Sequence, residues 1–291
     1  MSRLSWRTAC WLPGLAVLGV VLWRAGTAPF VAGVRSLDVS TLVLGAALAV
    51  PVTVAGAWRW HLVAKGLGVG VEPGPAVAAC YRSQFLNTVL PGGVLGDVHR
   101  GVRHGRLAGD TGRGVRAVVW ERAAGQVVQA TIAVGLLLLL PSPVRPLVWW
   151  LVGLLVVGAL ALAVVLAVRS ARAGWLRRVA WPGVLLASTV AVAGHLTTYV
   201  VAARAVGVTA STATLLPLAV VVLMAAGLPT NVAGWGPREG VAAWSFAAAG
   251  LGAGAGVATA VAYGAIVAVA SLPGAALLLT LPVRARRSAH G

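Results

Sequence analysis

The stretch AGAGVATAVAYGAIVAVASLPGAALLLTL, residues 253–281, contains no charged side chain. It is longer than the roughly 20 apolar residues that an α-helix needs to cross a bilayer. Similar apolar runs recur along the chain, separated by loops that hold most of the charged residues. We therefore predict an all-α, polytopic integral membrane protein with about six spanning helices, at 9–23, 40–64, 115–140, 146–168, 183–206 and 253–281.

The composition supports this fold class and excludes several others. Apolar residues form 59% of the 291 residues and charged residues 10%, whereas soluble domains average about 45–50% and 25%. So few acidic side chains cannot solvate a globule of this length, which excludes a soluble enzyme, a coiled coil and a disordered chain. The net charge of +17 lies in short loops, which indicates a membrane surface and not nucleic acid as the partner. We predict a single domain over 1–291.

Two further apolar segments are too short to cross a bilayer comfortably, namely 75–90 and 213–228. Each ends in Leu-Pro followed by a Gly-rich stretch, which is typical of a half-helix or a re-entrant loop. The stretches LPGGVLGDVHRGV, from Leu90, and LPTNVAGWGPREG, from Leu228, match at several positions without gaps. We interpret them as an inverted repeat with halves near 1–140 and 141–291, whose broken helices meet near the membrane midplane.

The basic residues predict which side of the membrane each loop faces. If the N-terminus lies inside and the segment 75–90 returns to the side it entered, most Arg side chains fall in inside loops. Arg59 and Lys65 are counted among these inside charges. Abundant Ala, Val and Gly, with Arg in place of Lys, indicate a GC-rich bacterial genome. We therefore expect a multi-pass protein of the bacterial plasma membrane with both termini in the cytoplasm.

Polar residues gather around the first Leu-Pro break. One helical face holds side chains at spacings of three and four, namely Ser83, Gln84, Asn87 and Thr88. The loop that follows ends the helix and exposes backbone amides that can cradle an anion, through Pro91, Gly92, Gly93 and Gly96. Asp97 and Arg100 come next, three residues apart. The alternative is a capped cytoplasmic helix with Asp97 as N-cap and Arg100 in solvent.

The predicted span 115–140 contains charges about one turn inside its start. Glu121 and Arg122 are followed by Gln126 and Gln129 at helical spacing, so the polar side chains form a stripe. Because charged residues within a bilayer are costly, we expect this stripe to face the protein interior. The alternative is that the two charged side chains extend along the helix to the interface.

The second break, PTNVAGWGPREG, places Arg238 and Glu239 beside glycines. The pair either pins the loop as an internal ion pair or uses Arg238 to meet an anion, and the sequence favours neither. In the predicted span 183–206, His195 and Tyr199 are four residues apart, so His195 is either a packing residue or part of a proton relay.

The sequence lacks the motifs of several enzyme classes. It has no Walker lysine motif, no nucleophile elbow and no zinc-type cluster of Cys and His, so we expect no cofactor, no metal and no catalytic residues. The acidic residue Asp38 lies in a predicted outer loop, where a membrane transferase that uses a lipid-linked donor would place its base. Asp97 and Glu239 are the other candidates for that role.

At its polar loops the chain resembles the lysylphosphatidylglycerol synthase transmembrane (flippase-like) family. The matching stretches are QFLNTVLPGGVLGDVHR (84–100), ERAAG (121–125) and LPTNVAGWGPREG (228–240). Leu95, Glu121, Ala233 and Pro237 depart from the family pattern. The resemblance implies a set of functional residues, to which the polar face adds Gln84: Asn87, Pro91, Gly92, Gly93, Gly96, Asp97, Arg100, Glu121, Arg122, Gly234, Gly236, Arg238 and Glu239.

In this family the membrane part is linked to lipid translocation and is often fused to a soluble aminoacyl-transferase or glycosyltransferase domain. Since we find neither domain in this sequence, the resemblance implies the translocating part and not the synthase. We therefore expect a flippase for an anionic or phosphate-bearing lipid or a polyprenyl-phosphate-linked precursor. The alternatives are a membrane subunit that serves a separate lipid-modifying synthase and a membrane transferase with a lipid-linked donor. Candidate partners are thus membrane lipids, a separate synthase and a second copy of the chain.

Overall fold

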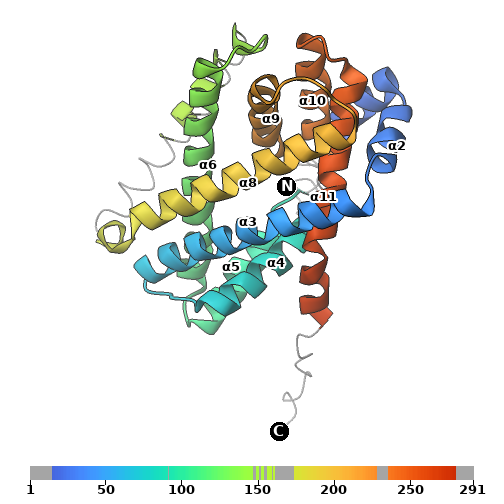
Figure 1. The fold of residues 1–291 in the computed structure, drawn as a ribbon. Coiled ribbons are helices and arrows are strands. Elements are labelled where there is room, and N and C mark those ends of the chain that lie inside the picture. Colours follow the sequence, from blue (N-terminus) through green and yellow to red (C-terminus); the bar gives the residue numbers. More distant parts are fainter. Residues whose placement is uncertain are drawn as a thin grey trace, which may run out of the picture.

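The computed structural model of the chain describes residues 15–90, 92–146, 149–150, 152–153, 156–158, 160, 174–227 and 235–279. Its regular elements in this part are helices (Figure 1), which confirms the all-α fold class. Four helices are long and apolar enough to cross a membrane, and a bent pair near the N-terminus raises the number to five. The chain is therefore a multi-pass helical membrane protein.

The four long helices coincide with four of the predicted spans. They are α3 (Val39–Gly66), α6 (Thr111–Leu139), α8 (Trp181–Ala205) and α11 (Ala253–Leu279). Asp38 begins α3 and Asp110 begins α6, because each carboxylate accepts a hydrogen bond from the backbone N–H three residues further on. The apolar runs that follow continue each helix across the width of a bilayer.

Two predicted spans are only partly covered by the described residues. The segment 9–23 includes part of the helix Leu15–Ala25, which is followed at once by α2 (Ala28–Arg35) at an angle of 94°. Gly26 lies in the turn with a φ of 71°, a conformation that favours glycine. The span predicted at 146–168 lies mostly outside the described residues.

The first Leu-Pro break separates α4 (Pro73–Val89) from α5 (Leu95–Leu107). Leu90 has an extended backbone (φ −95°, ψ 143°), which is the conformation that a following proline imposes. Gly92 and Gly93 then turn the chain with positive φ, so that α5 packs beside α4.

The second break separates α9 (Thr212–Ala226) from α10 (Pro237–Ala248). Gly236, with a φ of 118°, precedes the proline of the first turn of α10. We predict the first of these helices from the sequence but not α10, because we interpret the stretch up to Glu239 as a loop and the apolar residues that follow are too few to form a span. The structure thus contains a short helix on each side of each break.

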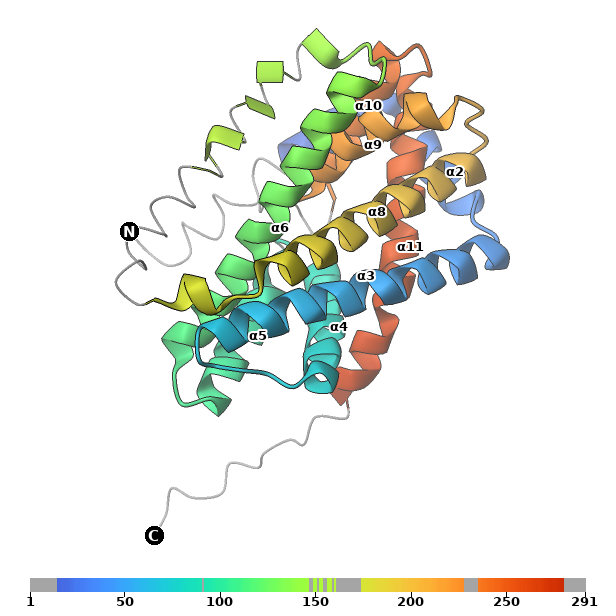
Figure 2. The ribbon, with the colours of Figure 1, turned by 60° about the vertical axis from the view of Figure 1, so that its left-hand side comes forward.

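One helix of each broken pair packs on α11, α4 near its C-terminal end and α10 near its N-terminal end (Figures 1 and 2). Near its C-terminal end, Gly274 lies directly against the backbone carbonyl of Tyr81 in α4. Near its N-terminal end, Gly256 lies in the same way against the carbonyl of Ala242 in α10. Glycine permits these close helix contacts because any Cβ would overlap the opposing carbonyl. An inverted repeat would require such an arrangement, and the repeat itself stays a prediction.

The core consists of apolar clusters, of which the largest joins α6, α8, α9, α10 and α11. Tyr199, Leu218 and Phe246 are fully buried in it. A second cluster joins α3, α4, α6 and the short 3₁₀ helix η2 (Trp175–Arg178) around buried tryptophans, including Trp60. These clusters fix the helices whose polar side chains border the cavity described next.

Candidate functional site

A cavity of about 330 Å³ lies among α3, α4, α5, α6, α8, α9 and α11. Part of its wall is apolar, from residues such as Val52 and Ile266. Its charged and polar lining comes from helices far apart in the sequence, namely Thr53, Arg59, Ser83, Gln84, Asn87, Asp97, Arg100, Glu121, Arg122, Gln126, Gln129, His195, Thr198 and Tyr263. The first break and the charged start of α6 therefore meet at one place.

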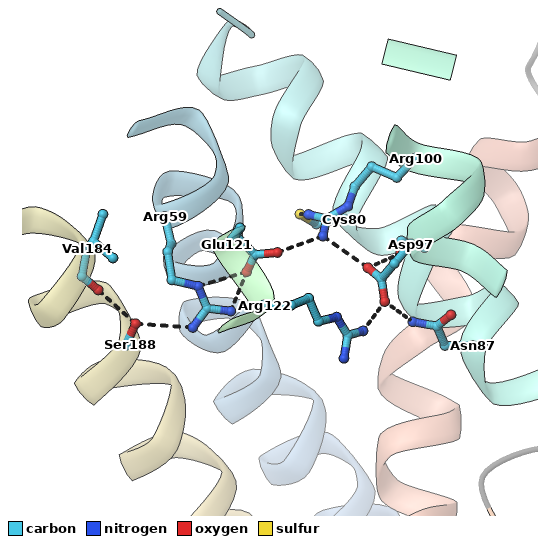
Figure 3. Close-up of polar contacts among 10 residues, drawn as sticks. Arg59, Cys80, Asn87, Asp97, Arg100, Glu121, Arg122, Val184 and Ser188 are labelled. Atoms are coloured by element: carbon cyan, nitrogen blue, oxygen red, sulfur yellow. Dashed lines mark hydrogen bonds and ion pairs between the residues drawn. The ribbon is translucent and has the colours of Figure 1, made fainter. Parts of the chain in front are cut away.

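Asp97 of α5 is the centre of one half of the charged network (Figure 3). Its Oδ1 accepts hydrogen bonds from Ser83 Oγ at 2.8 Å and Arg100 Nη2 at 3.0 Å. Its Oδ2 accepts from Asn87 Nδ2 at 2.8 Å and is ion-paired with Arg122. Asp97 therefore holds α4, α5 and α6 together through a single carboxylate.

Glu121 of α6 is the centre of the other half. Its Oε1 is ion-paired with Arg59 of α3, whose Nε donates at 2.7 Å, and its Oε2 accepts from Arg100 Nη2 at 2.8 Å. Arg59 also donates to Ser188 Oγ of α8 at 3.2 Å (Figure 3). The side chain of Glu121 is only 3% exposed, so these arginines supply the charge that its burial requires.

Arg100 links the two halves because it contacts both carboxylates. Its guanidinium also donates to Cys80 Sγ at 3.0 Å and lies 4.7 Å from the ring of Trp60, as a cation–π contact requires. Arg100 is 6% exposed. The network therefore runs without a gap from α8 through α3, α6 and α5 to α4.

Arg122 differs from the other two arginines of the network. Its side chain is 40% exposed, against 4% for Arg100 and 14% for Arg59. It pairs with Asp97 through one Nη atom and faces the cavity beside Gln126. Arg122 is thus the cation of the network best placed to meet a ligand.

The other end of the cavity contains a smaller polar group. Tyr263 Oη of α11 and His195 Nδ1 of α8 lie 2.9 Å apart, and both side chains border the cavity. The ring of Tyr263 lies 5.6 Å from that of Tyr199 and 5.6 Å from the guanidinium of Arg238. His195 therefore faces the cavity and has a hydrogen-bond partner there.

The second break forms a separate ion pair. Arg238 donates through Nε and Nη2 to Glu239 Oε1, at 2.9 and 2.6 Å, and Gly236 N donates to Glu239 Oε2 at 2.7 Å. Neither charged side chain borders the cavity. The guanidinium of Arg238 lies over the ring of Tyr263, and that ring does border the cavity. This geometry favours the internal ion pair of the two alternatives, and a binding role for Arg238 and Glu239 stays a prediction.

The predicted site residues thus divide into groups. Six of them border the cavity: Gln84, Asn87, Asp97, Arg100, Glu121 and Arg122. Others lie in the two breaks or in the first turn of the helix that follows, outside the cavity lining: Gly92, Gly93, Gly96, Gly236, Arg238 and Glu239. Two fall outside the described residues, namely Pro91 and Gly234. The binding role of the whole set stays a prediction.

The capped cytoplasmic helix, an alternative from the sequence, does not fit this geometry. The N-cap of α5 is Val94, and Asp97 lies inside the first turn with its side chain in the network. Arg100 is buried and not in solvent. Arg59 was counted among the inside charges, near the end of the span predicted at 40–64, and it lies within α3 and borders the cavity. Sequence reasoning missed Arg59 because it stands near the end of an apolar run, where basic residues ordinarily mark a loop.

Residues 11–274 match the family described as the lysylphosphatidylglycerol synthase TM region. The chain belongs to this family. No curated protein and no solved structure matches the chain. Family membership makes it a membrane protein of lipid metabolism or transport. Of the three stretches that resemble the family, the first two supply the cavity network and the third forms the Arg238–Glu239 pair.

Asp38, a candidate base for a membrane transferase with a lipid-linked donor, has a structural role as the N-cap of α3. Hydrogen bonds from Thr41, and then from Ser40, lower the pKa of its carboxyl to about 2, so it is a weak base. We expect Asp38→Asn to leave lipid turnover and thermal stability nearly unchanged, because Asn also caps helices. Asp38→Ala, in contrast, should lower the melting temperature measurably. A loss of activity in Asp38→Asn, with its melting temperature intact, would contradict the capping role.

Proposed function

We propose that this chain is a flippase that moves a phosphate-bearing lipid or lipid-linked precursor between the leaflets of the bacterial plasma membrane. The observation that supports this most directly is the charge of the cavity. Three arginines and two carboxylates border it, so its formal charge is +1 when His195 is counted as neutral. Charged side chains within a helical membrane protein are costly and typically mark a substrate pathway. An anionic headgroup would balance the excess positive charge of this cavity.

The barrier that such a protein lowers is the passage of a polar headgroup through hydrocarbon. In our proposal the phosphate binds Arg122, while the acyl chains stay in the lipid outside the helices. The broken pairs α4–α5 and α9–α10, which contact opposite ends of α11 through α4 and α10, would move in turn to open the cavity to either leaflet. We place both termini in the cytoplasm, as the distribution of basic residues indicates.

Reconstitution into liposomes tests this function directly. Phospholipids or polyprenyl-phosphate sugars that bear a fluorescent label are quenched by dithionite only in the outer leaflet. We expect the purified protein to speed the exchange of labelled anionic lipid between the leaflets, relative to empty liposomes. If it leaves the leaflet distribution of every phosphate-bearing lipid unchanged, the proposal is wrong.

Arg122→Gln should slow this exchange by about 10–100-fold, which corresponds to the loss of one charge-assisted contact with a phosphate. The matched control is Arg116→Gln, because Arg116 is exposed on the same helix and donates only to a backbone carbonyl. We expect the control to exchange lipid at the wild-type rate. Equal rates for the two variants would exclude Arg122 as the phosphate ligand.

A further inference from the structure

Every carboxylate oxygen of the cavity already accepts at least one hydrogen bond. Both oxygens of Asp97 have two donors each. Both oxygens of Glu121 are engaged by Arg59 or Arg100. A carboxylate oxygen offers about two lone-pair sites, so these two side chains are close to saturation. A ligand that brings an ammonium group into the cavity would find no free carboxylate.

One row of hydrogen-bonding groups at the cavity lies along a single face of α6. Arg122, Gln126 and Gln129 are spaced four and three residues apart, and all three border the cavity. Within the described part of the chain, the side chains of Gln126 and Gln129 have no hydrogen-bond partner. Amide groups of this kind both donate to and accept from hydroxyl groups. This face of α6 therefore offers the cavity one available cation and, beyond it, two neutral amides.

The spacing sets the order of groups in a ligand. Arg122 and Gln129 are about 10 Å apart along the helix axis, at about 1.5 Å per residue. A phosphate at Arg122 would thus be followed by hydroxyl groups at the two glutamines. An ammonium at the same place would lie near unneutralised guanidinium charge in a medium of low dielectric constant, where like charges repel strongly.

We propose that the cavity binds a phosphodiester followed by an uncharged, polyhydroxylated headgroup, a glycerol or a sugar, and excludes headgroups that bear an ammonium. This inference rests on the proposed function and names the substrate class of the same cavity. It deepens that function, because a phosphate-bearing lipid could carry either kind of headgroup.

Binding of short-chain lipids to the detergent-purified protein tests the inference separately from transport. The probes are dihexanoyl phosphatidylglycerol, phosphatidylmethanol, phosphatidylcholine and lysyl-phosphatidylglycerol, and the readout is the rise in melting temperature with concentration. We expect phosphatidylglycerol to bind about tenfold more tightly than phosphatidylmethanol, which has the same phosphodiester and no hydroxyl. The two lipids with a cationic group should bind more weakly than either. Equal affinity for phosphatidylglycerol and any other probe would overturn the proposal.

A double variant locates the hydroxyl subsite. Gln126→Leu with Gln129→Leu removes no hydrogen bond found in the described structure, so the protein should still fold. We expect it to bind phosphatidylglycerol no better than phosphatidylmethanol, with phosphatidylmethanol unaffected. The control is Thr131→Val, because Thr131 is exposed on α6 and its hydroxyl bonds only Val127 O. If the double variant keeps the preference for phosphatidylglycerol, the glutamines are not the subsite and the proposal fails.

The transport assay separates the two proposals. If labelled phosphatidylglycerol and phosphatidylcholine exchange between leaflets at the same rate, the function stands and the headgroup inference is wrong. If the binding preference is found but no lipid exchanges, the headgroup inference stands and the flippase proposal is wrong.

Discussion

Glu121→Gln is expected to lower the free energy of unfolding by about 3–5 kcal/mol, because it leaves buried guanidinium charge without its counter-ion. Glu121 is the carboxylate of Arg59 and one of the two carboxylates of Arg100. A glutamine also has only one side-chain oxygen. Its amide nitrogen, itself a donor, would therefore face either Arg59 or Arg100 in place of an acceptor. The expected fall in melting temperature in detergent is on the order of 10 °C.

The matched control for Glu121→Gln is Asp110→Asn. Asp110 begins the same helix and pairs with Arg113 at 3.2 Å, but both side chains are exposed. Because an exposed pair adds little and Asn remains a good N-cap, the change should stay within about 0.5 kcal/mol. Similar small shifts for both variants would mean that the buried network does not depend on Glu121, and the arrangement of charges inferred above would be wrong.

Sequence periodicity and apolar length predict the long helices because those helices depend on local properties. A run such as 253–281 has only one favourable state in a bilayer, where every backbone group must bond within its own helix. The breaks are also predictable, since a proline after an apolar helix ends it and glycines allow the turn. Helix α10 was not predicted, although Pro237 and Glu239 in its first turn are typical of a helix start, and it packs through Ala242 against Gly256 of α11.

The cavity network could be predicted in part. The spacing of Glu121, Arg122, Gln126 and Gln129 places them on one face, and only the cost of burying charge indicates that this face points inward. That Asp97 meets Arg122 follows from the packing of α5 against α6, which no local pattern encodes. The partner of Arg59 could not be predicted either, since Glu121 lies on another helix and Arg59 itself stands near the end of an apolar run.

Gly96→Ala is expected to reduce lipid exchange to the rate of empty liposomes and to cost about 1–3 kcal/mol of stability. A Cβ at Gly96 would overlap the carbonyl of Ser83 and lie 2.8 Å from Asn87 Oδ1. The backbone of α4 at Ser83 cannot move aside as a flexible side chain can, so α5 would have to move away from α4 to relieve the overlap. Asp97 would then lose its hydrogen bonds from Ser83 and Asn87, and Arg122 would lose the partner that positions it.

The control for Gly96→Ala is Gly135→Ala in α6, where a Cβ would meet no atom within 4 Å. Alanine is the better helix former by up to about 1 kcal/mol, so this variant should be as stable as the wild type or more so. The comparison isolates the contact between α4 and α5 from the general effect of replacing a helical glycine. If Gly96→Ala exchanges lipid as fast as Gly135→Ala does, the close approach of α5 to α4 is not what positions Asp97 and Arg122.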